Sequence, residues 1–386
     1  MFTKTLPAFI FTLSIITAPF VFADPPRVTD ATKIASFAIP PNNWYQYFIF
    51  DPKGEIIFAK TSEGHVHRLN IQSGEIMDFG KLMDPAQWYE QQLDIHPCRD
   101  MLLIAGGVDG RSNAIDLLDS KDGSVLKTFS FPGRNMRFRY VYFINGGRQW
   151  LTFSYSEDQR KRVRRSFIIV DVETGKMTEK TVPFASRPEP GFALDIRREK
   201  IALIHATDHA NYFVIYDLNN NFRPLHKFSF SPYTVSNIIF MNNNQSVIYF
   251  NDFGIINSKI ELAVGMRHLG QEEDDFTLVS PTPIRECAVS GDDKNMFLSL
   301  EPKKQLFVNF KAAKAIGAQE LRNPLFSNDS KLFAAIDLAD GNEGIIEVYC
   351  VDSLSSLCAE KGITLDFLLP SSGPKSGTKL KSIQVK

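Results

Sequence analysis

The sequence predicts an all-β fold made of about seven repeats, each a sheet of four antiparallel strands. Seven segments share one pattern: a short apolar strand, a turn rich in Asp, Asn, Gly and Lys or Arg, and a second apolar strand. The 32 phenylalanines suit stacked sheets, because large apolar side chains fill the space between twisted sheets. The repeat governs every later assignment, since an overlooked repeat misassigns the whole fold.

The spacing of the repeats indicates the architecture. The second strand of each segment begins at the following residues: Ile56, Leu102, Trp150, Ile201, Val247, Met296 and Leu332. The intervals are 46, 48, 51, 46, 49 and 36 residues, close to the ~40–50 residues of a four-stranded propeller blade. A second hairpin follows the first in the clearest repeats, as in residues 65–80. We therefore predict a single β-propeller over residues 24–369.

Closure of the ring requires a strand that covers the exposed edge of the last sheet. Residues 33–39 precede the first hairpin and have the character of an outermost strand. Residues 363–369 are a competing candidate, and the sequence leaves both open. Residues 370–386 are small, polar and basic, so we expect them to form a disordered tail.

With these repeats the chain resembles the seven-bladed propellers of the WD-repeat and quinoprotein-like kind, over about residues 28–368. The resemblance is architectural, because no repeat carries a Trp-Asp dipeptide and the quinoprotein tryptophan motifs are missing from the sequence. It implies the fold and the placement of the loops, and it assigns no functional residue.

The first 23 residues have the features of a secretory signal peptide. Lys4 is followed by an uncharged apolar stretch that ends with Val21 and Ala23 at the positions a signal peptidase inspects. A membrane-spanning helix needs roughly 20 predominantly apolar residues, and this stretch contains Pro7 and Pro19. We predict an exported protein, periplasmic or extracellular, with no membrane span in the mature chain.

The charge balance and the missing motifs disfavour several functional classes. The chain has 43 Lys and Arg residues against 44 Asp and Glu residues, which gives no reason to expect nucleic acid or bulk anionic lipid as a partner. The sequence contains no motif of a serine hydrolase, a nucleotide-binding loop or a c-type haem site. We expect a monomer and predict no cofactor, with Ca²⁺ or Zn²⁺ as the candidates if an ion binds.

Four cysteines in an exported chain favour a disulfide. Cys350 and Cys358 flank the turn-like residues 352–356, so two adjacent antiparallel strands would bring their sulfur atoms together. We predict a disulfide between them. Cys98 and Cys287 lie in different repeats, and we expect each to be a small buried residue.

The loops that join second to third strands should share one face of the ring, where propellers normally bind ligands. Two candidate metal sites fall there. His205, Asp208 and His209 form an H-x-x-D-H cluster, and His65 and His67 share one face of a strand. Imidazoles with a carboxylate hold zinc or copper, whereas loop histidines are often only surface hydrogen-bonding groups.

A set of seven loop carboxylates offers a different site, near the mouth of the central channel. Its members are Glu63, Asp109, Asp158, Asp208, Asp252, Glu301 and Asp337. They could bind Ca²⁺ or act on a substrate through a bound water, as in lactonase-type propellers. Asp is also common in loops for turn chemistry alone. A metal-assisted hydrolase is therefore the alternative function.

A run of basic residues is the most unusual local composition in the chain. Its members are Arg160, Lys161, Arg162, Arg164 and Arg165. Five positive charges in six residues repel one another, so the segment should be solvated and attract an anionic partner, or else form a protease-sensitive hairpin tip. Asp109 and Arg111 in a neighbouring loop are further candidate binding residues. We predict a binding or scaffold module for a protein, a polysaccharide or another anionic surface.

Overall fold

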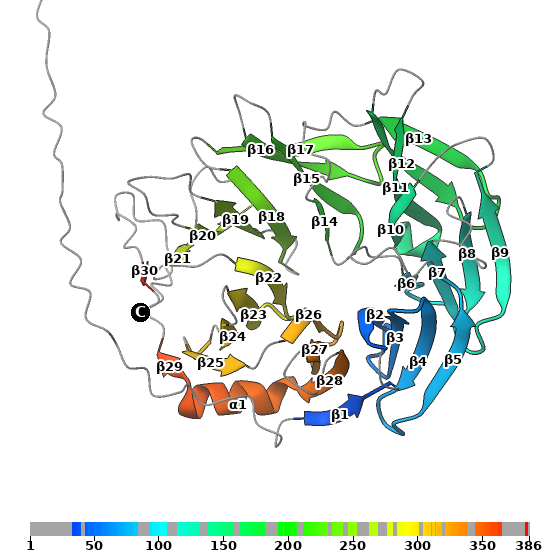
Figure 1. The fold of residues 1–386 in the computed structure, drawn as a ribbon. Coiled ribbons are helices and arrows are strands. Elements are labelled where there is room, and N and C mark those ends of the chain that lie inside the picture. The colour runs from blue at the N-terminus through cyan, green and yellow to red at the C-terminus, as the bar shows by residue number, and fades with distance from the viewer. Residues whose placement is uncertain are drawn as a thin grey trace, which may run out of the picture.

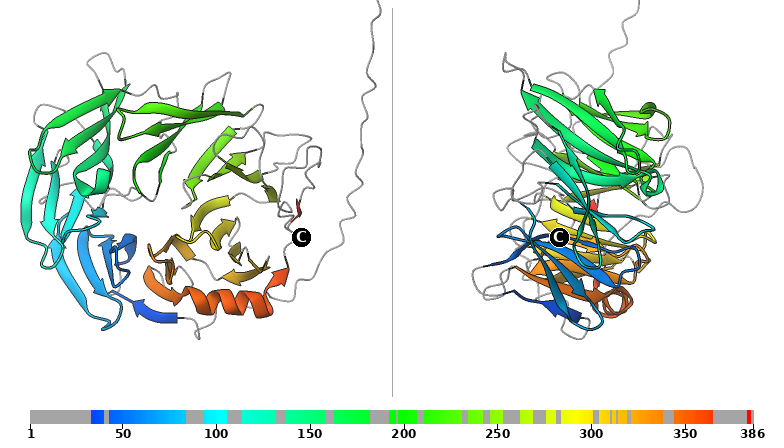
Figure 2. Two further views of the ribbon diagram at one scale, coloured as in Figure 1. Left: turned by 180° about the vertical axis from the view of Figure 1, so that it is seen from behind. Right: turned by 90° about the vertical axis from the view of Figure 1, so that its right-hand side faces the viewer.

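The strands of this protein are arranged as sheets around a ring. The computed structural model describes residues 33–39, 43–83, 93–105, 114–131, 137–157, 163–181, 192–195, 197–206, 211–230, 234–241, 246–252, 262–268, 276–280, 284–300, 304–309, 311–312, 314–318, 321–337, 344–364 and 383–384. Within these residues the strands form seven sheets, which follow one another around a central axis (Figure 1). Figure 2 shows the same ring from behind and from its edge.

Each of the first four sheets, which we call blades 1 to 4, has four antiparallel strands in chain order. Blade 1 consists of β2 (Tyr45–Phe50), β3 (Ile56–Thr61), β4 (His65–Asn70) and β5 (Ile76–Lys81). Blade 2 consists of β6 (Leu93–Ile95), β7 (Met101–Ala105), β8 (Ala114–Asp119) and β9 (Val125–Ser130). Blade 3 consists of β10 (Arg137–Ile144), β11 (Gln149–Glu157), β12 (Val163–Asp171) and β13 (Met177–Thr181), with a 3-10 turn at Asn145–Gly147. Blade 4 consists of β14 (Phe192–Leu194), β15 (Lys200–Ala206), β16 (Asn211–Asp217) and β17 (Arg223–Phe230).

The remaining sheets each include a strand from an end of the chain. Blade 5 consists of β18 (Thr234–Phe240), β19 (Ser246–Asp252), β20 (Leu262–His268) and β21 (Phe276–Ser280), with β30 (Ile383–Gln384) added in parallel. Blade 6 consists of β22 (Ile284–Val289), β23 (Asn295–Leu300), β24 (Lys304–Asn309) and β25 (Lys314–Ala318), with β29 (Ile363–Thr364) added. Blade 7 consists of β26 (Leu321–Phe326), β27 (Leu332–Asp337), β28 (Ile345–Cys350) and β1 (Lys33–Phe37).

The predicted β-propeller with four-stranded antiparallel blades is confirmed. Each hairpin recognised in the sequence repeats is the pair of strands that begins one sheet, and each residue used to measure the spacing is the first or second of its strand. Ile56, for example, opens β3, and Leu332 opens β27. Each blade must bury its apolar faces against its neighbours, so the same apolar pattern recurs in every repeat. This recurrence is why the repeat identified these strands.

The hydrophobic core lies between neighbouring blades. Successive residues of a strand point to opposite faces of its sheet, and blade 1 uses both faces. Phe48 and Phe50 pack with Ile346 of blade 7, whereas Ile49 packs with Leu102 of blade 2. Similar clusters join blades 2 and 3, 3 and 4, 4 and 5, and 6 and 7. Alternation within the strands therefore packs each of these pairs of blades together.

The N-terminal strand closes the ring. β1 pairs antiparallel with β28, with Phe37 opposite Ile346, so residues 33–37 become the outer strand of blade 7. Phe37 is buried in the cluster between blades 7 and 1. The first of the two closure candidates is thus confirmed. Of the second, Ile363–Thr364 pairs with β25 of blade 6 instead.

The prediction of a disulfide between Cys350 and Cys358 is wrong. All four cysteines are free thiols, and helix α1 (Val351–Lys361) occupies the segment that was expected to be a turn. Eight residues of helix separate two Cα atoms by about 12 Å, and a disulfide requires less than about 7 Å. Cys358 packs in the core between blades 6 and 7. Cys98 is exposed, so the expectation that it is buried is also wrong.

Two further expectations concern the ends of the chain. The predicted signal peptide, residues 1–23, lies outside the described residues. Of the predicted disordered tail, the structure describes only Ile383–Gln384, a short strand beside β21. No helix among the described residues is long and apolar enough to span a membrane.

Replacing Phe37 tests the closure of the ring. Phe37→Ala removes a fully buried ring from the contact between the first and last blades, and we expect it to lower the free energy of unfolding by about 3–5 kcal/mol. Ile34→Ala in the same strand is the matched control, because Ile34 is half exposed and should cost less than about 1 kcal/mol. Urea unfolding measures both. Equal effects would contradict closure by β1.

His96 connects blades 2 and 3 in its neutral form. Its Nδ1 atom accepts hydrogen bonds from the backbone N–H groups of Cys98 and Arg99, each at 3.0 Å. The ring packs edge-on against Phe143 and beside Gly147, whose φ of +87° and close approach leave no room for a Cβ atom. Burial, together with the charge of Arg99, lowers the pKa of His96 below its ordinary value, and a hydrogen bond with Gly147 opposes this.

This histidine should make stability depend on pH. Unfolded histidine ionises near pH 6.5, so below that pH the unfolded state binds protons that the folded His96 resists. Stability from His96 is therefore present above about pH 6.5 and decreases as the pH falls below it. His96→Asn keeps an acceptor and cannot ionise, so it should lose less stability than the wild type between pH 7.5 and 5. Chemical unfolding at both pH values measures this, and equal losses would contradict it.

Candidate functional site

The connections between strands gather on the two rims of the ring. In a sheet of four antiparallel strands, the second-to-third connection leaves on one rim, and the first-to-second and third-to-fourth connections leave on the other. We call the first rim A and the second rim B. The turn at residues 62–64 lies on rim A, whereas residues 51–55 and 120–124 lie on rim B.

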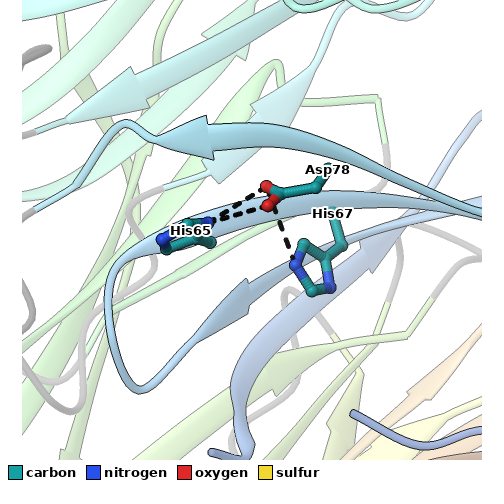
Figure 3. Close-up of side chains that lie close together, drawn as sticks. All are labelled: His65, His67 and Asp78. Carbon is teal, nitrogen blue, oxygen red and sulfur yellow. Dashed lines mark hydrogen bonds and ion pairs between the residues drawn. The ribbon is translucent and has the colours of Figure 1, made fainter. Parts of the chain in front are cut away.

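A group of two histidines and a carboxylate lies on blade 1 at rim A. His65 and His67 are two residues apart in β4, so they share one face of the sheet. Asp78 in β5 lies opposite His67 in the strand pairing, and the register shifts between His65 and His67. This shift lets one carboxylate contact both rings (Figure 3). Among the described residues, these three form the group that could share one metal ion.

The distances within this group are short. Nδ1 of His65 lies 2.9 Å from one carboxylate oxygen of Asp78 and 3.2 Å from the other. Nε2 of His67 lies 3.7 Å from Asp78 Oδ1. The Tyr45 hydroxyl, from the first strand of the blade, lies 3.0 Å from the other nitrogen of His67. The backbone N–H of Gly80 donates to Asp78 at 2.7 Å. Every ring and carboxylate of the group is thus oriented by a polar contact.

The surroundings set the protonation states of this group. Burial lowers the pKa of His67, and the charge of Asp78 opposes that shift. Burial would raise the pKa of Asp78, but the N–H of Gly80 and the ring of His65 hold it below the ordinary value. Burial raises the pKa of Tyr45, so its hydroxyl keeps its proton. At neutral pH the group therefore contains a neutral buried imidazole next to an ionised carboxylate.

The sequence indicated the histidine pair, and Asp78 was not among the predicted site residues. A signal for Asp78 was present, because a tight turn around Ser73 makes Leu69 pair with Ile76 and His67 pair with Asp78. The register shift that brings His65 to the same carboxylate had no such signal. Two imidazole nitrogens and a carboxylate can hold a divalent transition metal or move a proton.

A second polar cluster joins three blades at the inner strands. Arg198, in the turn between β14 and β15, forks onto the carboxylate of Asp94 in β6, with Nη2 at 2.9 Å from Oδ1 and Nη1 in contact with Oδ2. Nη1 of Arg198 also donates to the carbonyl oxygen of Phe143 at 3.1 Å. The N–H of Phe143 donates to Asp94. Blades 2, 3 and 4 are therefore linked through one ion pair.

Burial governs the electrostatics of this ion pair. It raises the pKa of Asp94, and Arg198 opposes the shift. Burial would lower the pKa of Arg198, but the carboxylate of Asp94 raises it. Tyr47 and Tyr142 lie close by, and burial raises the pKa of both hydroxyls. Because the two charges satisfy each other, we assign this cluster a structural role.

The H-x-x-D-H prediction falls partly outside the described residues. His205 lies near the end of β15, where it is buried and stacks on Tyr212 with ring centres 4.8 Å apart. Its Nε2 atom lies 3.4 Å from the Tyr216 hydroxyl. Asp208 and His209 lie outside the described residues, so a metal site there stays a prediction.

The other candidate residues are described only in part. Asp109, Arg111, Arg160, Lys161 and Arg162 lie outside the described residues. Arg164 and Arg165 follow Val163 at the start of β12, where they pair with Ser156 and Tyr155 of β11. Among the loop carboxylates, Glu63 is exposed in its turn, whereas Asp337 is fully buried. A calcium site built from these loops, and the hydrolase that it would serve, stay predictions.

Replacement of Asp94 tests the structural role of the ion pair. Asp94→Asn leaves Arg198 without its counter-charge, and we expect it to lower the free energy of unfolding by about 3 kcal/mol. This is the lower end of the range for a broken buried pair, because 30% of the Arg198 side chain is exposed. Urea unfolding measures it. Asp100→Asn, which breaks the exposed pair with Lys121, is the control and should leave the midpoint close to that of the wild type. A stable Asp94→Asn protein would contradict the role.

Comparisons with known proteins agree with the fold and go no further. No protein-family model matches the sequence, and no curated protein matches it. Among solved structures, the chain is similar to hydrazine synthase of Kuenenia stuttgartiensis, with a TM-score of 0.57 and 8% identity over 81% of this chain and 97% of that one. It is also similar to the Cps50 (Swd1) β-propeller domain of Myceliophteria thermophila, with a TM-score of 0.57 and 10% identity over 83% and 99%. The chain is a β-propeller, and identities this low show the fold alone.

Proposed function

We propose that this protein is an exported binding or scaffold propeller that presents rim A to the anionic surface of a protein or a glycan. The proposal joins two features: a rigid ring held together by the cores between its blades, and a basic segment carried at one rim. Loops positioned by a rigid scaffold are the usual place for binding residues. The signal-peptide features of residues 1–23 support export.

The observation that carries the proposal is the length of the β11–β12 hairpin. The two strands have nine residues each and pair without a break from Gln149↔Asp171 to Glu157↔Val163. The corresponding strands of blades 1 and 6 have six residues each. Three further residues extend a strand by about 10 Å. The β11–β12 hairpin is therefore about 10 Å longer than the corresponding hairpins of those two blades.

Part of the basic run belongs to this long hairpin. Arg164 and Arg165 are the second and third residues of β12, and the other three basic residues come shortly before β12 in the sequence. A concentrated positive charge on a ring that is nearly neutral overall creates a local positive potential. Such a potential attracts polyanions such as sulfated glycans or acidic protein surfaces, and salt weakens the attraction.

The fold is compatible with this function. One of the two similar structures is a propeller domain and the other is an enzyme by name, so the fold alone does not choose between binding and catalysis. The binding proposal therefore depends on the hairpin and its charge.

The experiment compares the wild-type protein with a variant in which Arg160, Lys161, Arg162, Arg164 and Arg165 are all replaced by Gln. Immobilised heparin serves as a sulfated glycan, and immobilised poly-L-glutamate serves as an acidic polypeptide. We expect the wild type to bind at least one of them, with an affinity that falls as the salt concentration rises. The variant should bind at least about tenfold more weakly than the wild type.

A matched variant separates the position of the charge from its amount. Five exposed lysines on rim B are replaced by Gln: Lys53, Lys121, Lys176, Lys294 and Lys331. Both variants lose five positive charges, and circular dichroism should show that both keep the fold. Equal losses of binding would contradict the proposal for the hairpin, as would a wild type that binds neither matrix at low salt.

A further inference from the structure

We propose that His65, His67 and Asp78 bind one divalent transition-metal ion of the Zn²⁺ class at rim A of blade 1. The three residues come from two neighbouring strands of one sheet, so no rearrangement of blades is needed to bring them together. The site is independent of the basic hairpin, which belongs to blade 3.

The distances between the candidate ligand atoms suit a small ion. Zinc bonds to nitrogen and oxygen are about 2.0–2.2 Å, so two ligands at a tetrahedral ion lie about 3.4 Å apart. Asp78 lies 2.9 Å from Nδ1 of His65 and 3.7 Å from Nε2 of His67, and all three ligand atoms lie within 4.8 Å of one another. Small rotations of the exposed side chains therefore suffice to surround one ion.

The neighbours of the three ligands are those that a metal site requires. Metal-bound histidine usually gives its second ring N–H to an oxygen atom, which fixes the ring and its tautomer. Nε2 of His67 faces Asp78, and Nδ1 lies 3.0 Å from the Tyr45 hydroxyl, which can accept that N–H. Tyr45 is 1% exposed, and its ring packs edge-on against His67. The N–H of Gly80 holds the carboxylate of Asp78 in the same way. The site is thus oriented from its buried side.

The exposed side of the group leaves room for a further ligand. The His65 side chain is 31% exposed and that of Asp78 is 48% exposed, whereas that of His67 is only 10% exposed. Three protein ligands with an open position are the pattern of zinc sites that keep a water or accept a group from another molecule. Mixed imidazole and carboxylate ligands favour Zn²⁺, Ni²⁺ or Cu²⁺ over Ca²⁺ and Mg²⁺, which prefer oxygen.

A plain hydrogen-bonded cluster is the competing interpretation of the same geometry. The Nδ1–H group of His65 would then donate a hydrogen bond to the carboxylate of Asp78, as the 2.9 Å distance allows. The two interpretations differ in what the group does with added metal, because an ion replaces the proton between the ring and the carboxylate.

The test is a calorimetric titration of the metal-free protein with Zn²⁺ at pH 7.5. The protein carries no affinity tag and is first freed of metal with a chelator. We expect one equivalent to bind with a dissociation constant in the micromolar range or below. His65→Gln and Asp78→Asn should each weaken binding at least tenfold. Both residues are partly exposed, so these variants should fold. Titration with Co²⁺ should give the visible absorption bands of a four-coordinate ion in the wild type and lose them in both variants.

Two further variants make the result specific. Tyr45→Phe removes only the oxygen that orients His67 and should weaken Zn²⁺ binding about 10- to 100-fold, with an unchanged near-ultraviolet dichroism spectrum. His209→Gln tests the other candidate metal cluster and should bind Zn²⁺ as the wild type does. Absence of binding at millimolar Zn²⁺, full binding in Asp78→Asn, or loss of binding in His209→Gln would each overturn the proposal.

Discussion

The burial of apolar side chains between neighbouring blades is the constraint on which the rest of this structure depends. A single four-stranded sheet has two apolar faces and cannot cover either by itself, so stability requires a neighbour on each side. Phe48 and Ile49, adjacent in β2, illustrate this, because one packs towards blade 7 and the next towards blade 2. A chain built this way must close, and β1 closes it by pairing with β28.

Closure also determines where the polar groups lie. Because each blade faces its neighbours with apolar side chains, polar residues are left for the inner strands and the two rims. On the inner strands, Asp94 and Arg198 join three blades in a buried ion pair. At rim A, the buried Tyr45 orients His67 in the group formed by His65, His67 and Asp78. The ion pair thus depends on several blades, whereas the group at rim A is oriented within blade 1.

The candidate site was partly accessible to sequence reasoning. The i, i+2 spacing of His65 and His67 placed both on one face of a strand, which follows from the pleat alone. The pairing of His67 with Asp78 follows from the position of the turn between β4 and β5, because the two residues lie at matching distances from that turn in the sequence. The contact of Asp78 with His65 depends on a register shift, which no local pattern in the sequence predicts.

The class of fold and the first hairpin of each blade follow from the sequence alone, because a repeated hairpin of this period has few ways to bury both faces of its sheets. Which end of the chain closes the ring is seen only in the folded protein. The same holds for the helix at residues 351–361. This helix keeps Cys350 and Cys358 apart, and the residue Ile363 after it pairs with β25. These outcomes depend on contacts between residues far apart in the chain, such as Phe37 with Ile346, and no local pattern carries that information.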